Sequence, residues 1–389
     1  MSLHVLRFLT SGESHGRGLI AVLEGIPANL PLKEEDVNKD LERRQKGYGR
    51  GGRMKIEKDR ACFLSGVRFG KTLGSPLAIW IENKDWENWK EKMSVEESSV
   101  FIKPFSKPRP GHADLTGGIK YNQRDLRNIL ERASARETVA RVAAGSVCKK
   151  FLEELGIRIG SYVLSIGNLK PPIKERDLIK RHELAESSEV RFPDPDRDKD
   201  FKELIDKVRE KGESLGGIFE VFAVGVPPGL GSHIQWDKRI DGRIAQAIMS
   251  IQAIKGVEIG MGFESAYKWG SEVQDEIGYN DKKGYFRYSN NLGGTEGGIT
   301  NGMPLIIRAA MKPIPTLMKP LRSIDIETKE QVKAAKERSD VTAVPAASVV
   351  GEAMLALVLA DALLEKLGGD FLEEIKERYN SYLKHINSF

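Results

Sequence analysis

Two stretches of this chain repeat one another: GESHGRGLIAVLEGIPANL at residues 12–30 and GESLGGIFEVFAVGVPPGL at residues 212–230. Each begins with Gly-Glu-Ser, continues through an apolar run typical of a β-strand, and ends in a Gly-x-Pro turn. We therefore expect strands at residues 19–24 and 218–224. The repetition indicates that the chain holds two copies of one folding unit.

Two further pairs of segments follow in the same order. Residues 66–77 and 294–305 share spaced glycines and a Pro-Leu ending, and they predict strands at 77–81 and 305–310. Residues 135–156 and 347–368 predict long apolar helices, each ending in a glycine suited to a left-handed cap. Helical spacing also occurs at 36–44 and 237–254.

These elements predict an α+β fold for a single domain at residues 1–389. Tight turns between neighbouring strands favour antiparallel pairing over βαβ crossovers. The two repeats would cover about 1–165 and 205–389, related by a pseudo-twofold axis and joined by a connector at 166–204. The stretch 170–206 is rich in Pro, Arg and Asp and is expected to be exposed. Nothing functional is inferred from it or from the loop at 85–110.

Composition excludes several classes of protein. The 389 residues are 40% hydrophobic and 30% charged, which is typical of a folded domain and not of a disordered chain. Two cysteines are too few for a disulfide framework or a zinc finger. No signal-peptide core or run of 18 apolar residues is evident, so we expect a cytoplasmic protein. The net charge of +5 suits nucleic acid, an acidic membrane surface or an anionic small molecule.

The first repeat carries polar side chains where the second does not. His15 of the first repeat corresponds to Leu215 of the second, and the arginines at 43, 44, 50 and 53 correspond to a mostly apolar stretch at 244–256. Guanidinium groups in a glycine-rich loop match phosphate and carboxylate oxygens. The alternative is a solvated basic loop. A duplicated fold with one polar copy predicts one asymmetric site that takes a polyanion.

Other segments extend this predicted anion site. In KPRPGHAD at 107–114, two prolines stiffen a turn that holds Arg109 and His112. In RASARET at 132–138, small residues open a long helix, with Arg132 and Arg136 expected on one helix face. An ordinary capped helix start is the alternative reading.

The second half offers a similar group of polar residues. A glycine-rich run at 293–302 precedes KPIPT at 312–316, a loop suited to hold a phosphate or cofactor, and then Arg338-Ser-Asp340. Asp340 is either a positioned proton acceptor or one half of a surface ion pair. No P-loop and no Rossmann fingerprint occur, and the six histidines lack zinc-ligand spacing, so no metal is expected.

Several of these motifs together resemble the signature blocks of the chorismate synthase family. They are GESHG at 12–16, ERASARET at 131–138 and RSDVT at 338–342, supported by RPGHAD at 109–114 and KPIPT at 312–316. The resemblance extends from about residue 6 to 369. It implies an internally duplicated β-α-β sandwich, with antiparallel sheets around a helical layer, that assembles as a homotetramer.

The resemblance also implies the reaction. The chain would convert 5-enolpyruvylshikimate 3-phosphate to chorismate and phosphate by a 1,4-anti elimination, the last step of the shikimate pathway, with reduced FMN as cofactor. NADPH is one candidate reductant, and a separate flavin reductase is the other source of reduced flavin. Nucleic acid and membrane partners are not expected.

Residue roles follow from the same resemblance. His15 would act near the leaving phosphate, His112 would protonate or hydrogen-bond the flavin, and Asp340 would relay the proton collected at flavin N5. The substrate would be bound by Arg44, Arg50, Arg53, Arg109, Arg136 and Arg338. The cofactor would contact Arg132, Ala133, Ser134, Gln252, Ala253, Gly297, Lys312, Pro313, Ile314, Pro315, Thr316 and Arg338.

Two alternatives stay open at this point. One is a different FMN-dependent oxidoreductase that acts on a phosphorylated substrate and oxidises reduced flavin at each turnover. The other is a nucleic-acid-binding protein that uses the same arginine clusters. Against the second, the arginines lie in Gly/Pro-stiffened loops with few interleaved aromatic residues, and no known nucleic-acid module is evident.

Overall fold

Two four-stranded antiparallel sheets provide the framework of the molecule. The structure is a computed structural model that describes residues 5–51, 57–97, 101–281, 284–337 and 340–389. The first sheet has the order β1-β2-β6-β3, made of Arg7–Ser11, Gly18–Glu24, Leu77–Glu82 and Ala61–Phe63. The second has the order β7-β8-β14-β9, made of Arg158–Ile166, Gly217–Val224, Leu305–Met311 and Ile254–Ile259.

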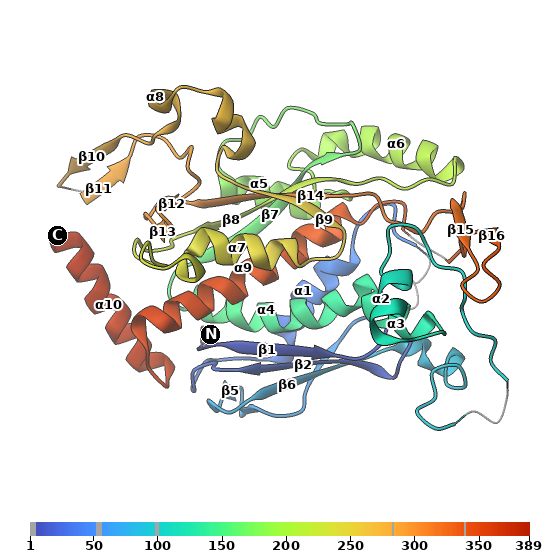
Figure 1. Ribbon diagram of the computed structural model, residues 1–389. Coiled ribbons are helices and arrows are strands. Elements are labelled where there is room, and N and C mark those ends of the chain that lie inside the picture. Colours follow the sequence, from blue (N-terminus) through green and yellow to red (C-terminus); the bar gives the residue numbers. More distant parts are fainter. Residues whose placement is uncertain (1–4, 52–56, 98–100, 282–283, 338–339) are drawn as a thin grey trace.

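Helices lie between the two sheets, as Figure 1 shows. They are α1 (Glu34–Gln45), α4 (Thr138–Glu153), α7 (Ile240–Met249) and α9 (Val344–Leu367). Helix α4 packs on β2 and β6 of the first sheet, α9 packs on β7 and β8 of the second, and the two helices pack on each other. The apolar side chains of both sheets and these helices form one continuous core.

Helices α4 and α9 cross at very short distance because small residues meet there. A Cβ atom added at Gly145 would lie 2.4 Å from the Cβ of Ala353, closer than atoms can approach. Helix α9 is long and apolar enough to cross a membrane by length and composition alone, but 94% of that stretch is buried within the protein. Its composition is therefore explained by its place at the centre of the core.

Smaller elements surround this framework. Two-stranded ribbons are β4/β5 (Val67–Arg68, Lys71–Thr72), β10/β11 (Ile277–Asn280, Gly284–Arg287), β12/β13 (Thr295–Glu296, Ile299–Thr300) and β15/β16 (Arg322–Ile324, Gln331–Lys333). The other α-helices are α2 (Asp114–Tyr121), α3 (Arg127–Ala133), α5 (Leu178–Ser187), α6 (Asp198–Glu210), α8 (Gly270–Val273) and α10 (Leu372–Ser388). Short 3₁₀ turns span Lys84–Asn88, Ala135–Glu137, Pro195–Arg197, Trp236–Lys238 and Gly262–Tyr267.

The four strands expected from the repeats are confirmed as β2, β8, β6 and β14, and their pairing is antiparallel. One helix expectation is wrong, because α7 ends at Met249 and residue 254 already begins β9. The expectation of an exposed connector is wrong in part, because many residues of that stretch are exposed but the connector is folded. It contains α5 and most of α6, and Val190, Phe192 and Phe201 are fully buried. The buried apolar residues of the connector are spaced too widely among its charged residues to form a recognisable apolar run in the sequence.

Candidate active site

Arg44 and Arg136 share one buried carboxylate. Asp59 Oδ2 accepts a hydrogen bond from Arg44 Nη2 at 3.0 Å, and Asp59 Oδ1 accepts one from Arg136 Nη1 at 2.5 Å. Arg44 lies in the last turn of α1, and Arg136 lies in the 3₁₀ turn before α4. The buried atoms Arg44 Nε and Arg136 Nη2 have no hydrogen-bond partner among the described residues. Such donors are suited to an oxyanion ligand.

Arg50 places a third positive charge near this pair. Burial and the charges of Arg136 and Arg50 lower the pKa of Arg44 to about 10, against the opposing attraction of Asp59. Asp340 holds the loop that carries Arg50, because its Oδ1 accepts from the Gly51 backbone N–H at 2.6 Å and its Oδ2 lies 3.3 Å from Arg50 Nε. A bound anion would relieve the repulsion among these guanidinium groups. The predicted substrate residues Arg53 and Arg338 lie outside the described residues.

The imidazole ring of His15 is contacted at its edge by Glu131 and on its face by Trp89. Its Nδ1 lies 2.9 Å from Glu131 Oε1, and its backbone N–H donates to Glu131 Oε2 at 2.8 Å. Its ring stacks on Trp89 with 3.9 Å between ring centroids. Burial alone would raise the pKa of Glu131, but hydrogen bonds and charge from His15 lower it, so the carboxylate stays ionised.

Arg132 and Arg136 do not share a helix face, contrary to the sequence expectation. Helix α3 ends at Ala133, and Ser134 is extended (φ −62°, ψ 144°) before the next turn. The Arg132 guanidinium donates to the carbonyl oxygens of Thr10 and Gly12 at 2.7 and 3.1 Å. Arg136 instead reaches Asp59 and Asn83. The break at Ser134, whose hydroxyl accepts from the Arg136 backbone N–H, turns the two side chains apart.

A second group surrounds His112. Its Nδ1 lies 2.6 Å from Asp114 Oδ1, and Asp114 also accepts two side-chain hydrogen bonds from Arg109 at 2.9 and 3.1 Å. Burial opposes ionisation of Asp114, but the His112 and Arg109 hydrogen bonds hold its pKa far below the usual range. Arg109 Nη1 donates to Thr316 Oγ1 at 3.0 Å, which ties this turn to the predicted cofactor loop.

Gln252 and Ala253 lie between the two groups. Gln252 Nε2 donates to Glu137 Oε2 at 3.0 Å, and the buried Gln252 Oε1 has no hydrogen-bond partner among the described residues. The Ala253 carbonyl accepts from the Lys312 backbone N–H at 2.9 Å, and Lys312 Nζ donates to the Gly111 carbonyl at 2.7 Å. Burial, with the charge of Lys255, lowers the pKa of Lys312. Predicted cofactor residues of two distant segments, Ala253 and Lys312, therefore contact each other, and Gln252 contacts Glu137, three residues after Ser134.

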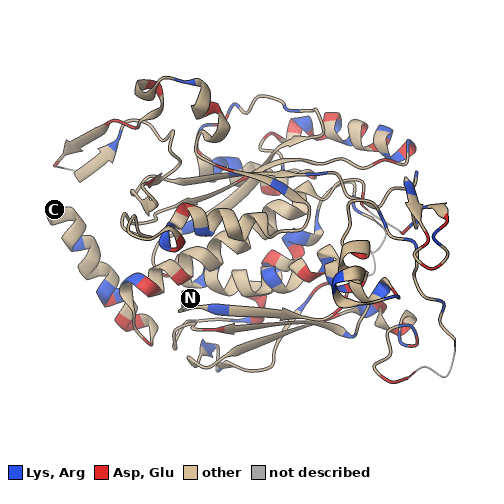
Figure 2. Ribbon diagram, viewed as in Figure 1, with Lys and Arg blue, Asp and Glu red and all other residues tan. Residues whose placement is uncertain are grey.

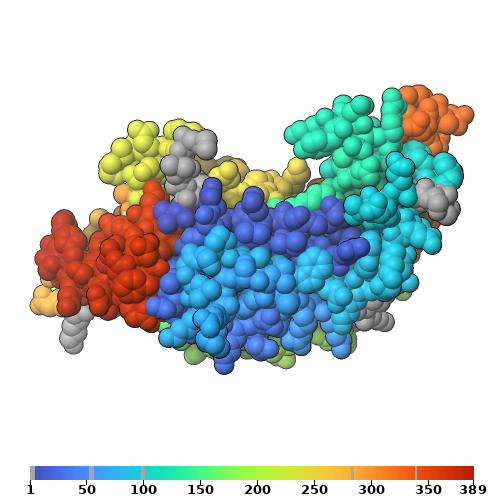
Figure 3. Space-filling view, turned by 90° about the horizontal axis from the view of Figure 1, so that it is seen from below, coloured from blue at the N-terminus to red at the C-terminus, as the bar shows by residue number. Residues whose placement is uncertain are grey.

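The surface of the molecule is hollowed next to the part of the chain that holds α2 and α3. Figure 3 shows a hollow between the teal part of the chain, which holds α2 and α3, and a yellow part that belongs to its second half. Gly297 lies elsewhere. It is in the β12–β13 turn and lines a cavity of about 530 Å³ with Ile259 and Met261, at the end of β9 opposite to Gln252. The six residues of β9, about 20 Å of extended chain, separate the two positions.

Comparisons with known proteins identify the family of this chain. The sequence model of the family described as chorismate synthase matches residues 6–364. The chain belongs to the chorismate synthase family. The chorismate synthase of Aquifex aeolicus (strain VF5) is 71% identical to it, with 100% of both chains covered. That of Sulfurihydrogenibium sp. (strain YO3AOP1) is 60% identical, covering 99% of this chain and 100% of the relative.

A solved structure supports the same assignment. A crystal structure of chorismate synthase superposes with a TM-score of 0.83 at 61% identity, and 100% of each chain is covered. The resemblance read from the signature blocks is thus confirmed over nearly the whole chain. The two sheets and intervening helices described above belong to a member of this family.

Arg43 does not join its neighbour Arg44 in this family member, although the sequence grouped them. Its Nη1 and Nη2 donate to the two Glu352 oxygens at 2.8 and 2.7 Å, and its Nη2 also donates to Glu186 at 2.6 Å. The cluster joins three cations to three carboxylates: Arg43, Lys149 and Arg191 with Asp40, Glu186 and Glu352. Adjacent residues on a helix point about 100° apart, which separates the two arginines.

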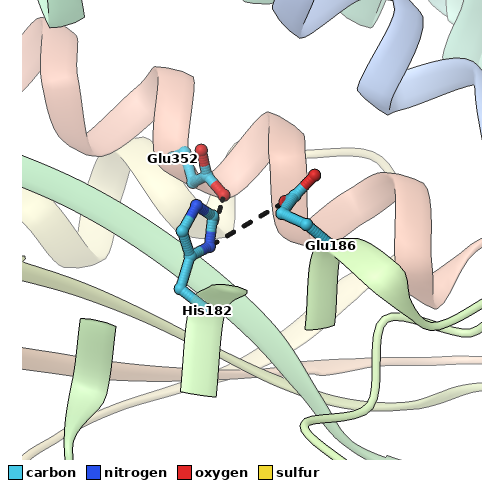
Figure 4. A group of neighbouring side chains, drawn as sticks. All are labelled: His182, Glu186 and Glu352. Atoms are coloured by element: carbon cyan, nitrogen blue, oxygen red, sulfur yellow. Dashed lines mark ion pairs between the residues drawn. The ribbon is translucent and has the colours of Figure 1, made fainter. Parts of the chain in front are cut away.

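His182, Glu186 and Glu352 face one another in this cluster, as Figure 4 shows. His182 Nδ1 lies 3.9 and 4.0 Å from the two carboxylates. Burial and the charge of Arg43 lower the pKa of His182, against the attraction of Glu352. The carboxylates already bind Arg43, Lys149 and Arg191, so we interpret the group as a buried charge network and not as a metal centre.

The sequence reading missed two contacts of the site. Trp89 stacks on His15 from the 85–110 loop, to which no function was assigned. Asp59, the shared partner of Arg44 and Arg136, lies in no quoted motif. A single carboxylate or tryptophan carries no local signal of its partner, because that partner lies 15 or more residues away along the chain.

Proposed function

We propose that the chain converts 5-enolpyruvylshikimate 3-phosphate to chorismate and phosphate by a 1,4-anti elimination with reduced FMN. This would be the last step of the shikimate pathway. The observation that carries the proposal is the buried pair Arg44 and Arg136, whose atoms Arg44 Nε and Arg136 Nη2 have no hydrogen-bond partner among the described residues although both guanidinium groups share Asp59. A substrate with one phosphate and two carboxylates supplies charged acceptor oxygens for these donors.

The arginines near Asp59 and the arginine beside His112 would bind the substrate. Arg44, Arg50 and Arg136 would bind anionic groups at the α1 and α4 ends, and Arg109 would bind one near His112. Because Asp59 and Asp114 fix the guanidinium groups before the ligand arrives, little reorganisation would accompany binding. Arg53 and Arg338 are proposed to complete this set.

The residues around Gln252 fit a flavin cofactor. Its Oε1 is a buried acceptor without a hydrogen-bond partner among the described residues, which a ring N–H can satisfy, and Lys312 supplies a cation for a phosphate. Arg132, Ala133, Ser134, Ala253 and Lys312 to Thr316 would complete the binding surface, with Arg338 as a further proposed contact, whereas Gly297 lies in a separate cavity. Reduced FMN, when bound, supplies the electron-rich ring that C–O cleavage needs.

Three side chains would take part in proton transfer. His15 would donate a proton to the departing phosphate, while the electron pair of the breaking C–O bond leaves with that phosphate. His112, engaged at Nδ1 by Asp114, would present Nε2 to the cofactor. Asp340 would take up and pass on the proton lost from C6 of the substrate.

The fold arrangement supports an internal duplication. The sheet orders β1-β2-β6-β3 and β7-β8-β14-β9 place corresponding strands at corresponding positions around the helices. We propose a duplicated β-α-β sandwich with pseudo-twofold symmetry, residues 1–389 forming one domain. Since β7 pairs with β8, the division between the repeats would precede Arg158.

Assembly and supply of reduced flavin complete the proposal. We propose a cytoplasmic homotetramer, for which exposed tyrosines on the β10–β11 ribbon, Tyr279 and Tyr285, would be suitable interface residues. Reduced flavin would come from NADPH oxidation by the chain itself or from a separate reductase. NADPH oxidation in air with added FMN distinguishes the two.

The function is tested by measuring phosphate release from 5-enolpyruvylshikimate 3-phosphate with photoreduced FMN under anaerobic conditions. We expect catalytic release by the wild-type chain and strong loss in His112→Ala. Gln252→Leu removes the amide acceptor and should weaken flavin binding about tenfold, measured by quenching of flavin fluorescence. No release by folded protein would refute the proposal.

A further inference from the structure

Glu131 belongs to one of the signature blocks but was given no role there, and in the structure it makes several contacts with His15. It is 1% exposed, near the end of α3. His15 Nδ1 lies 2.9 and 3.0 Å from the two carboxylate oxygens, and the His15 backbone N–H donates to Oε2 at 2.8 Å. The Glu131 carbonyl also accepts from the Ser14 backbone N–H at 3.0 Å. One residue therefore fixes both the loop that carries His15 and the edge of its ring.

The face of the same ring is held by Trp89. The two rings stack at 3.9 Å with planes 23° apart. Arg127 contacts both partners of the His15 ring. Its Nη1 donates to Glu131 Oε1 at 3.1 Å, and its guanidinium lies 5.2 Å from the Trp89 ring centroid. Rotation of the His15 ring would break the carboxylate contact and the stack together.

We propose that Glu131 is a positioning residue for His15, which fixes the orientation of the His15 ring and holds its Nδ1 protonated while His15 acts on the leaving phosphate. The proposal rests on the proposed function, and it adds a residue to which that function assigned no role. A carboxylate bonded to Nδ1 sets the tautomer of a histidine and stabilises positive charge on its ring. Trp89 would hold the plane of the ring, so that His15 keeps one orientation during proton transfer.

The kinetic test compares Glu131→Gln with Glu220→Gln. Glu220 is a matched control, because it is 3% exposed and accepts from Arg308 Nε at 2.9 Å within the second sheet. We expect Glu131→Gln to lower kcat about 10- to 100-fold while KM changes less than about threefold. Glu220→Gln should leave kcat within about twofold. Glu131→Asp, which keeps the charge, should recover part of the loss.

A spectroscopic measurement separates this inference from the proposed function, because it needs no substrate. In protein labelled with ¹⁵N-histidine, the Nδ1-bound proton of His15 should resonate downfield, since its partner is charged. His15→Gln assigns the signal. In Glu131→Gln the signal should move upfield or be lost to exchange.

Two outcomes would overturn the proposal. One is an unchanged Nδ1–H signal in Glu131→Gln. The other is a kcat loss no larger than that of Glu220→Gln. If the wild-type chain releases no phosphate, the proposed function fails, while the spectroscopic result still decides whether Glu131 fixes the ring of His15.

Discussion

Arg44 and Arg136 bind opposite oxygens of the same buried carboxylate, so Asp59 balances two guanidinium groups at once. Glu57 adds partial compensation at 3.6 Å from Arg136 Nη2. Burying two like charges beside one main counter-charge is unfavourable for an isolated fold. Arg44 Nε and Arg136 Nη2 also have no hydrogen-bond partner among the described residues, and an anionic ligand that accepts from them would stabilise the arrangement. This relationship underlies the proposed substrate site.

The first prediction concerns Asp59→Asn. Removing the shared carboxylate should lower the free energy of unfolding by about 3 kcal/mol, because two buried cations lose their main partner. Inorganic phosphate should restore stability more in this variant than in the wild type. Urea unfolding with phosphate, against chloride of equal ionic strength, measures the difference. An equal phosphate effect in both proteins would show that phosphate binds elsewhere.

The buried charge network gives a second prediction. Glu352→Gln leaves Arg43, Lys149 and Arg191 short of one counter-charge and should cost about 3–5 kcal/mol of unfolding free energy. Glu365→Gln, on the same helix but 40% exposed at its side chain, should cost at most about 1 kcal/mol. Denaturant unfolding of both variants provides the comparison. Equal costs would contradict the account of the network.

Glu186 predicts a dependence of stability on pH. Burial would raise its pKa, but hydrogen bonds and charge from Arg43 and Arg191 lower it to about 2 from the ordinary 4.5. A carboxyl with a lower pKa in the folded state adds stability above pH 4.5, and this is lost as pH falls toward 2. Because Glu186 is partly exposed, we expect about 1 kcal/mol. Glu186→Gln should flatten the unfolding free energy over this window, and an unchanged slope would exclude Glu186 as its source.

Gly145→Ala tests the helix crossing by the sign of its effect. Helix propensity alone favours alanine by about 1 kcal/mol. The added Cβ would lie 2.4 Å from Ala353, so we expect net destabilisation of about 2 kcal/mol. Gly270→Ala, where an added Cβ meets no atom within 4 Å, is the control. Thermal unfolding of the two variants decides the point, and a stabilised Gly145→Ala would show that the helices can separate.

The repeated stretches predicted the central strands of both sheets because apolar runs bounded by Gly-x-Pro turns are local signals. Helix boundaries were less predictable. The break at Ser134 depends on the hydroxyl that caps the next turn, and the end of α7 depends on β9 pairing with β14. Neither feature alters the helical spacing of the sequence around it.

The site could be predicted only in part, for a similar reason. Arginine-rich loops and their anionic ligand class follow from composition and spacing. The divergence of Arg43 from Arg44 depends on Glu352, more than 300 residues away. The stack of Trp89 on His15 likewise depends on how the 85–93 segment folds over the first sheet. Partners brought together by tertiary packing leave no pattern in a single sequence.

The most direct test is the stoichiometry of the reaction. Enzyme, 5-enolpyruvylshikimate 3-phosphate and a small amount of photoreduced FMN are mixed anaerobically, and phosphate release and flavin absorbance are followed together. An elimination without net redox change predicts many phosphates released per flavin while the flavin stays reduced. Oxidation of one flavin for each substrate consumed, or the absence of phosphate release, would contradict the account.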